Sequence, residues 1–302
     1  MSSQKIWNLF ELKDWEKFDN YPIDFRWYCD LIDEDSRYKI HDDTIIYTEN
    51  LHLYAPKLRN ITKPKYRFLA VVNTQRLLGL HQLGKRDEFE DGLKALRKLA
   101  QNGILFNTFI NPTYKLSNWP SGMAQGQYLS CLLRSKPVDE EYCKIVYNSL
   151  FKETSLNGVF NSVSQYFEEY PTTPHSSVLN GHLYSLIGII EYELKIKHAL
   201  TKKTENILTS TLNSLNKYLA TDGHFYDAWE NPANESYQKL HVLQLKIISK
   251  LIYADEKSST FTYYSNKFEQ RIGKLNERKT SNISIKVAKL YYLLKGVYHE
   301  NK

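Results

Sequence analysis

Hydrophobic positions along the middle of the chain recur at intervals of three and four residues, in stretches of two alternating kinds. Residues 122–133 and 177–190 are apolar around most of the helix circumference, which predicts buried helices. Residues 139–151 and 205–219 keep one polar face, which predicts helices with one side in solvent. The alternation therefore predicts pairs of helices, one buried and one half-exposed, repeated along the chain.

A turn motif separates these pairs. Asn-Gly or Asp-Gly follows a helical stretch at Gly103, Gly158 and Gly223, at intervals of 55 and 65 residues, and a short apolar or aromatic run comes next. A glycine after a helix predicts a left-handed C-terminal stop, and the residues beyond it predict a short β-hairpin. The next helix then begins behind a residue that can cap it: Ser121, Ser176 or Asn234.

Repeated helical pairs with hairpins at one end predict an all-α dominated fold, an (α/α) toroid or barrel whose inner helices surround a cavity. An irregular helical bundle is the alternative. Residues 1–65 do not follow the repeat and mix a helical stretch with short strand-like runs, so we expect them to form an N-terminal cap. Residues 66–302 would then form the barrel.

Composition narrows the class of protein. Of the 302 residues, 42% are hydrophobic and 25% are charged, which is typical of a globular protein that buries a core. No stretch approaches the ~18 apolar residues of a membrane span, and the first residues show no apolar secretion segment. The three cysteines lack metal-ligand spacing, as in a reducing compartment. We therefore expect a cytoplasmic protein.

Charge and familiar motifs exclude further classes. The net charge of +6 is spread thinly, without the basic block of a nucleic-acid-binding protein. The sequence has no phosphate-binding glycine loop, paired-cysteine zinc pattern, HExxH or nucleophile-elbow serine, so we expect no cofactor and no metal. The 23 tyrosines are many, and aromatic side chains often line grooves for sugars. Any chemistry would come from glutamate, tyrosine and histidine.

The stretch YFEEYPTTPHSSVLNG, residues 166–181, places two acids beside a turn that leads into a buried helix. Tyr170 precedes a proline, which favours an extended backbone. Successive side chains of an extended chain alternate, so Glu168 and Tyr170 would share one side while Glu169 faces the other. This predicts an acidic cluster at the mouth of the cavity; a solvated acidic loop is the alternative.

Polar stripes follow two of the predicted buried helices. Tyr237, His241 and Gln244 stand at i, i+4 and i+7 on a mostly apolar helix, where buried polar groups need partners or a cavity. A satisfied core histidine is the alternative. Gln127 belongs to a similar stripe on residues 122–133, and Tyr226 would lie in the third hairpin, at the cavity end. Small residues on these helices predict close helix packing: Gly122, Gly126, Gly181, Ser185 and Gly188.

Four segments together resemble one enzyme family: WPSGMAQGQYLSCLLRS, FEEYPTTPHSSVLNGHLYSLIG, GHFYDAW and SYQKLHVLQL. Their order and spacing are similar to those of the C-terminal domain of D-glucuronyl C5-epimerases, which convert D-glucuronate to L-iduronate within heparan-type polysaccharides. The resemblance extends over residues 119–254 and, less strongly, over residues 66–118. It implies an (α/α) barrel and a metal-free proton transfer at C5 of a hexuronic acid.

The resemblance also implies site residues and a partner. It places the catalytic residues at Glu169, Tyr170 and Tyr237. The substrate-binding residues that we assign are Glu168, Tyr226, His241, Gln244, Gln127 and Asn180. Trp229 stands where family members have an arginine. The implied partner is an acidic polysaccharide that contains hexuronic acid, such as a bacterial surface glycan before export. Whether the protein forms a homodimer stays open.

The reaction sets requirements that these side chains can meet. The C5 proton of a uronate is weakly acidic, so its removal needs a positioned base and relief of charge on the carboxylate, and inversion needs a donor on the opposite side. Glu and Tyr ordinarily have pKa values of about 4.3 and 10, so burial and clustering must shift them toward neutrality. We expect Glu169 to be one base and Tyr237 or Tyr170 its counterpart, with Tyr226 and His241 positioning the sugar.

Two other functions would use the same cleft. If the C4 glycosidic bond leaves in place of reprotonation, the protein is a polysaccharide lyase, which the ultraviolet absorbance of an unsaturated uronate would detect. The third function is a non-catalytic protein that binds uronate polysaccharides. Such a protein would bind the polymer without changing its proton NMR spectrum.

Overall fold

The computed structural model describes residues 21–26, 29, 46–48, 51–54, 67–108 and 116–274, and these residues form the fold given below. Most of the expected N-terminal cap, residues 1–65, lies outside the described residues. The sequence of residues 284–298 also predicts a helix, and these residues lie outside the described part of the chain as well. The division into a cap and a barrel at residue 65 therefore stays a prediction.

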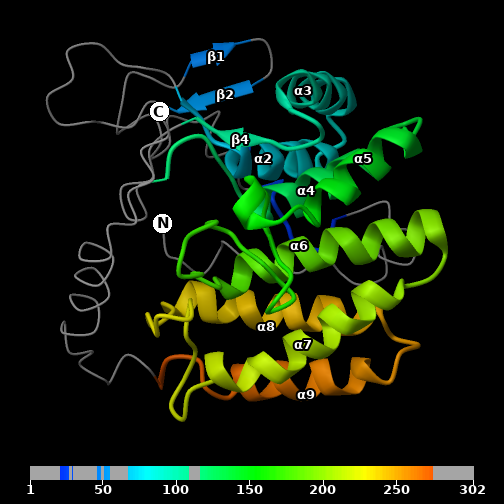
Figure 1. Ribbon diagram of the computed structural model, residues 1–302. Helices are drawn as coiled ribbons and strands as arrows, with labels where there is room; N and C mark the ends of the chain where they lie inside the picture. The colour runs from blue at the N-terminus through cyan, green and yellow to red at the C-terminus, as the bar shows by residue number, and fades with distance from the viewer. Residues whose placement is uncertain are drawn as a thin grey trace, which may run out of the picture.

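Helices make up most of the described chain, and several of them are stacked one above another (Figure 1). Their bounds are α2 Ala70–Gln82, α3 Arg86–Leu99, α4 Gly122–Leu132, α5 Glu140–Leu150, α6 Leu179–Tyr192, α7 Lys202–Tyr218, α8 Glu235–Leu251 and α9 Lys257–Glu269. Among the described residues, helix packing forms a row in which α2 contacts α4, α4 contacts α6, α6 contacts α8 and α8 contacts α9. The α-dominated class is thus confirmed, whereas closure of the row into a toroid stays a prediction.

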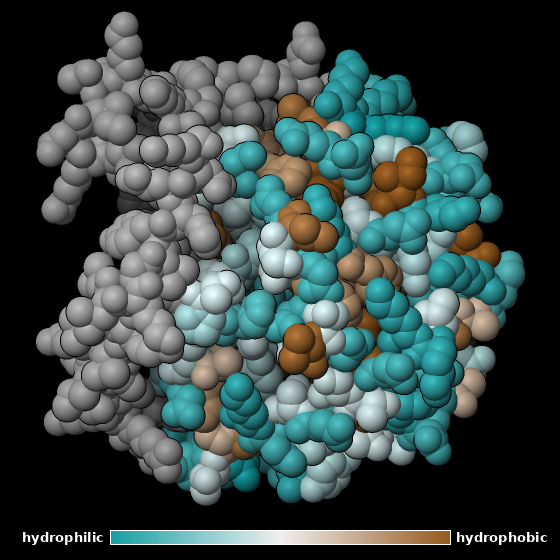
Figure 2. Space-filling model, viewed as in Figure 1, coloured by the Kyte–Doolittle hydropathy of each residue, from teal (hydrophilic) through white to brown (hydrophobic). Residues whose placement is uncertain are grey.

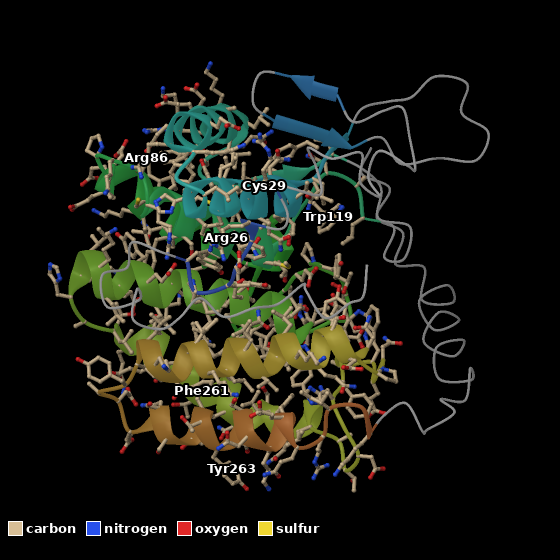
Figure 3. All side chains as sticks on the ribbon, turned by 180° about the vertical axis from the view of Figure 1, so that it is seen from behind. Arg26, Cys29, Arg86, Trp119, Phe261 and Tyr263 are labelled. Carbon is tan, nitrogen blue, oxygen red and sulfur yellow. The ribbon has the colours of Figure 1, made fainter. Side chains whose placement is uncertain are left out.

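Burial follows the alternation expected from the sequence. Every residue of α4 and of α6 is buried, whereas α5 and α7 bury one face only. The outermost helix α9 shows the same division, because Phe261 lies fully buried between α8 and α9 while Tyr263 points outward and is 52% exposed (Figure 3). The prediction of buried and half-exposed helices is confirmed for these elements.

Short strands join the helices. In one hairpin β4 (Phe106–Asn107) pairs with β5 (Trp119–Pro120), and in the next β6 (Phe160–Asn161) pairs with β7 (Tyr166–Phe167), both antiparallel. The third expected hairpin is reduced to one bridge between Phe225 and Pro232. Before α2, the strands β1 (Ile46–Thr48), β2 (Leu51–Tyr54) and β3 (Arg67–Phe68) form an antiparallel sheet. A 3₁₀ turn (Thr154–Leu156) and a π-helical turn (Glu193–Lys197) complete the elements.

Two of the three expected helix caps are confirmed. The Ser121 hydroxyl accepts the Ala124 amide N–H at the start of α4, and the Asn234 side chain accepts the Tyr237 amide at the start of α8. The cap expected at Ser176 is wrong, because α6 begins behind Val178 and has no side-chain cap. The Ser176 hydroxyl instead donates to the buried Glu168 carboxylate, at 3.1 Å. A buried carboxylate without a hydrogen-bond donor costs more free energy than a helix N-terminus without a side-chain cap.

The glycine turns share a sequence motif but not a backbone conformation. Gly103 has the expected left-handed φ of +80°. At the second turn the left-handed residue is Asn157, with φ of 62°, so the expectation for Gly158 is wrong. Gly158 is needed for a different reason: a Cβ there would lie 2.1 Å from the Lys152 carbonyl oxygen. Gly223 is not left-handed either.

Helices α4 and α6 approach each other through glycine, as their small-residue faces predict. A Cβ at Gly126 would lie 2.4 Å from the Tyr184 carbonyl oxygen, and one at Gly188 would lie 2.3 Å from the Gly126 carbonyl oxygen. Further along the same interface, Arg134 forms a buried ion pair with Glu191, at 2.6 Å. These contacts fix the middle and the C-terminal end of α6 relative to α4.

The surface in Figure 2 is mostly hydrophilic, with single hydrophobic side chains scattered over it. Within the described part of the chain, no helix combines the length and the apolar character that a membrane crossing requires.

Candidate functional site

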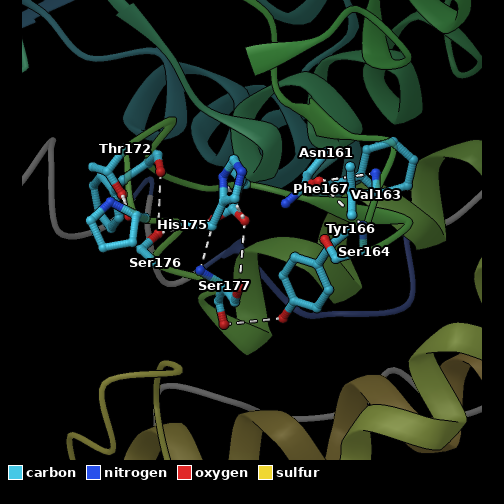
Figure 4. Close-up of polar contacts among 12 residues, drawn as sticks. Asn161, Val163, Ser164, Tyr166, Phe167, Thr172, His175, Ser176 and Ser177 are labelled. Atoms are coloured by element: carbon cyan, nitrogen blue, oxygen red, sulfur yellow. Dashed lines mark hydrogen bonds and ion pairs between the residues drawn. The ribbon is translucent and has the colours of Figure 1, made fainter. Parts of the chain in front are cut away.

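The two adjacent glutamates of the EEYP stretch have different surroundings. Glu168 is fully buried, and it accepts the Ser177 amide N–H at 2.7 Å and the Ser176 hydroxyl at 3.1 Å (Figure 4 shows these donors). Burial raises the pKa of Glu168 to about 7, although these hydrogen bonds oppose the rise. His175 Nδ1 lies 3.6 Å from the same carboxylate. Glu168 thereby holds the turn that leads into α6.

Glu169 has fewer partners. It is 7% exposed, and no described group donates to its Oε2 atom. Its side chain lies against Gly181 of α6, where a Cβ would come within 2.5 Å of Glu169 Cβ and 2.8 Å of Oε2. Burial raises the pKa of Glu169 to about 7, and a hydrogen bond from the Tyr170 side chain lowers it. The solvated acidic loop is excluded for both glutamates, because both are buried.

Aromatic rings surround Glu169. The Tyr170 ring packs against the Trp119 ring of β5, with centroids 5.2 Å apart, and Trp119 lies at the loop end of the helices (Figure 3). Tyr226 and Tyr237 meet edge to face, with centroids 4.6 Å apart. Burial raises the pKa of Tyr226 well above its usual value, and the next contributions come from Glu169, Tyr170 and Tyr237. The structure therefore brings these four predicted site residues together.

The third turn docks on the segment that contains the glutamates. The Tyr226 carbonyl accepts the Leu179 amide at the start of α6, at 3.0 Å, and so occupies the place of the missing side-chain cap. The Asp227 carboxylate accepts the Trp229 amide at 3.0 Å and the Asn231 side-chain amide at 2.8 Å. Trp229, at the family's arginine position, is half-buried in this turn. Backbone contacts thus position Tyr226 beside Glu169.

The polar stripe of α8 faces α6. Gln244 donates from Nε2 to the Asn180 carbonyl at 2.9 Å, which joins α8 to the first turn of α6. The Gln244 Oε1 and Asn180 Oδ1 atoms are buried and have no partner among the described residues. Two acceptors at this helix contact are therefore available to a donor.

His241 is fully buried, and its tautomer follows from its neighbours. His224 Nε2 lies 2.7 Å from the Phe268 carbonyl, so this nitrogen must be protonated and His224 Nδ1 must be an acceptor. His241 Nδ1 lies 3.4 Å from that acceptor and is therefore protonated, which leaves His241 Nε2 as an acceptor without a partner in the described structure. Burial lowers the pKa of His241 well below its usual value. The alternative of a fully satisfied core histidine is wrong.

Gln127 is placed elsewhere. Its Oε1 atom accepts the Thr74 hydroxyl of α2 at 3.0 Å, and its Nε2 atom is buried without a partner among the described residues. No contact in the described structure joins Gln127 to Glu169. Its assignment to the substrate site stays a prediction.

Tyr184 was not among the residues predicted from the sequence, although it lies beside them. It is fully buried on α6, and its hydroxyl has no partner in the described part of the chain. Burial raises its pKa well above the usual value, and the further contributions come from Tyr237 and Glu169. The sequence contained one indication that Tyr184 lies near the site, because this residue follows Asn180 and Gly181 by one helical turn.

A metal centre of ordinary composition is not formed by the described residues, since no three His, Cys, Asp or Glu side chains converge. The site they do form combines a buried carboxylate that titrates near neutrality with phenols from three elements. Such an arrangement can move protons and can present hydroxyl groups and rings to a sugar.

Comparison with known proteins agrees with the resemblance. A family model described as "D-glucuronyl C5-epimerase C-terminus" matches residues 104–270, more than half of the chain. The D-glucuronyl C5-epimerase of Caenorhabditis elegans is 34% identical over 160 residues. That alignment covers 43% of this chain and 26% of the relative, so the chain corresponds to about a quarter of that protein's length. The chain belongs to the D-glucuronyl C5-epimerase family, through the C-terminal domain of that family.

Proposed function

We propose that this protein is an isomerase that inverts C5 of hexuronic acid residues in an acidic polysaccharide, converting D-glucuronate to L-iduronate without a metal. The observation that supports it most is Glu169, a buried carboxylate with a pKa of about 7 and with one oxygen to which no described group donates a hydrogen bond. Near neutral pH such a group is ionised in a large fraction of molecules and can still accept a proton effectively.

In the proposed reaction the Glu169 carboxylate takes the C5 proton, and the electron pair of the C–H bond moves into the adjacent substrate carboxylate. A phenol on the opposite face then returns a proton to C5, so the product has the same atoms with inverted configuration. The phenolate regains a proton as Glu169 loses one, and no oxidant or reductant is needed. A phenol whose pKa lies above 10 still suffices, because the carbanion is far more basic.

Tyr237 is the better supported donor. It comes from α8, whereas Glu169 lies on the loop before α6, so the two groups belong to different elements. Tyr170 hydrogen-bonds the Glu169 carboxyl group itself, which suits a role in orienting the base. Tyr226 contacts Tyr237 edge to face and would orient that phenol or the substrate carboxylate.

Binding of the sugar would use the remaining predicted residues. The Tyr170 and Trp119 rings provide an aromatic surface of the kind on which sugar rings stack. His241 Nε2, Gln244 Oε1 and Asn180 Oδ1 are acceptors that sugar hydroxyls can satisfy. The polymer, a cytoplasmic location and a homodimer stay predictions.

Heparosan, a polymer that contains glucuronate, provides the test. After incubation with the protein, proton NMR should show new iduronate signals, and the Glu169→Gln variant should produce none. Glu235→Gln is the matched control, since Glu235 is exposed on α8 and, within the described residues, forms an ion pair with Lys239 at 2.6 Å. Absorbance of an unsaturated uronate would assign the protein to the lyases instead. Polymer binding with an unchanged spectrum, for heparosan and for other uronate polymers, would refute the proposed reaction.

A further inference from the structure

The Tyr184 hydroxyl is a buried polar group beside the site, and the reaction proposed above gives it no role. The side chain is fully buried, and no described atom accepts from or donates to the hydroxyl. A buried hydroxyl without a hydrogen bond costs about 1–3 kcal/mol, so its retention in a well-packed helix needs a reason. Tyr184 interacts electrostatically with Glu169 and Tyr237, the two groups assigned to the proton transfers.

The backbone of α6 brings Tyr184 toward the Glu169 carboxylate. Gly181 has no side chain, and Glu169 occupies the space that a Cβ would take, with Oε2 only 2.8 Å from that position. Tyr184 follows Gly181 by three residues, so both lie on the same face of the helix. On the other side, the Tyr184 carbonyl lies against Gly126 of α4, which fixes the helix in place.

Glu169 Oε2 and the Tyr184 hydroxyl are complementary. One is a buried acceptor and the other a buried donor, and neither has a partner among the described residues. The remaining phenols that interact with Glu169 are already engaged. Tyr166 donates to the Ser177 carbonyl at 3.2 Å, Tyr170 hydrogen-bonds the carboxyl group, and Tyr226 is paired with Tyr237.

We propose that the Tyr184 hydroxyl is a positioning donor for Glu169, which it holds through one water that bridges to Oε2. This inference rests on the proposed function, because it assigns a second support to the base of that reaction. Tyr170 and Tyr184 would then hold the carboxylate from two sides, and the remaining lone pairs of the carboxylate would face C5 of the sugar.

A hydrogen bond to the ionised form of a carboxylate favours that form, so Tyr184 would lower the pKa at which Glu169 becomes a base. A phenol suits this role because burial raises the pKa of Tyr184 well above its usual value, so it stays a neutral donor. The groups that face Glu169 from β7, its own loop, α6 and the third turn are Tyr166, Tyr170, Tyr184 and Tyr226. Glu168 also has a pKa of about 7 and titrates over the same range, so the shift of the acidic limb in Tyr184→Phe, rather than its position in the wild type, reports Glu169.

The test is the pH profile of deuterium incorporation at C5 of heparosan, measured by NMR in heavy water for the wild type and for Tyr184→Phe. The wild-type rate should fall below about pH 7, the pKa of Glu169. In Tyr184→Phe this fall should move up by about one pH unit, giving about a tenfold loss near pH 6 and little change above about pH 9. Tyr192→Phe, which changes a buried tyrosine at the far end of α6, should keep the wild-type profile.

An unmoved acidic limb would overturn the proposal, and so would an equal loss at every pH, which is the mark of a merely structural role. If Tyr184→Phe does not fold, 4-fluorophenylalanine at position 184 removes the donor and keeps the ring volume, and the same two outcomes apply. Failure of the proposed function would differ from failure of the Tyr184 proposal, because the wild type itself would then incorporate no deuterium.

Discussion

Replacement of Glu169 by glutamine should make the protein more stable while it abolishes activity. The pKa of this carboxyl group rises from 4.5 in an unfolded chain to about 7 in the fold, because burial disfavours the charge. Below about pH 4.5 both states are protonated and the group costs nothing. As the pH rises toward about 7 the unfolded chain ionises first, so folding loses stability, and above about pH 7 the loss is constant.

The magnitude follows from these two values. At about 1.36 kcal/mol for each pKa unit, the buried carboxylate costs the folded state about 3 kcal/mol at pH 8 and about 1 kcal/mol at pH 5. A neutral glutamine of the same shape avoids this cost. Glu169→Gln should therefore gain up to about 3 kcal/mol in free energy of unfolding at pH 8, and about 1 kcal/mol at pH 5.

Urea denaturation at the two pH values measures the gain directly. Glu235→Gln is the control, since this exposed side chain should change the free energy of unfolding by no more than about 0.5 kcal/mol at either pH. A gain in Glu169→Gln that is equal at both pH values, or a loss of stability at pH 8, would refute the assignment of Glu169 as a buried carboxylate with a raised pKa.

Three further substitutions probe the site and its supports. Gly181→Ala places a methyl group 2.8 Å from Glu169 Oε2, so it should lower C5 deuterium exchange at least about tenfold and cost about 1–3 kcal/mol by thermal denaturation; an active, equally stable variant would contradict this contact. Arg134→Met leaves the buried Glu191 carboxylate unpaired and should cost about 3–5 kcal/mol in urea denaturation, most of which Glu191→Leu in the same chain should restore. A single variant as stable as the wild type would show that the pair is not buried. Tyr237→Phe removes the proposed donor and should lower iduronate formation about 100-fold or more while heparosan binding persists; unchanged formation would assign the donor to Tyr170.

Local pattern predicted the elements well and their tertiary partners less well. Apolar periodicity identified α4 and α6 as buried, and Ser121 as a cap, because these properties depend on neighbouring residues alone. Ser176 has the same local signature as Ser121, yet its hydroxyl bonds the Glu168 carboxylate. That choice depends on the burial of a residue eight positions earlier, which a capping rule does not consider.

The candidate site was predicted largely through family resemblance, because no spacing rule connects a loop glutamate with tyrosines on a distant turn and helix. The structure brings Glu169, Tyr170, Tyr226 and Tyr237 together, as the resemblance implies. Tyr184 escaped prediction because a tyrosine on an apolar helix usually belongs to the core. Its unpartnered hydroxyl beside Glu169 became visible only once the helices were packed.

Hydrogen exchange at C5 of the substrate tests the proposed chemistry most directly. A uronate polymer incubated with the protein in heavy water should incorporate deuterium at C5 of both glucuronate and iduronate. Each proton that returns to C5 comes from a side chain whose hydrogen exchanges with the solvent. Mass spectrometry of the digested polymer would count the deuterium, and Glu169→Gln should incorporate none. Glucuronate polymers that all remain unlabelled in the presence of the folded wild-type protein would contradict the assignment of Glu169 as the base.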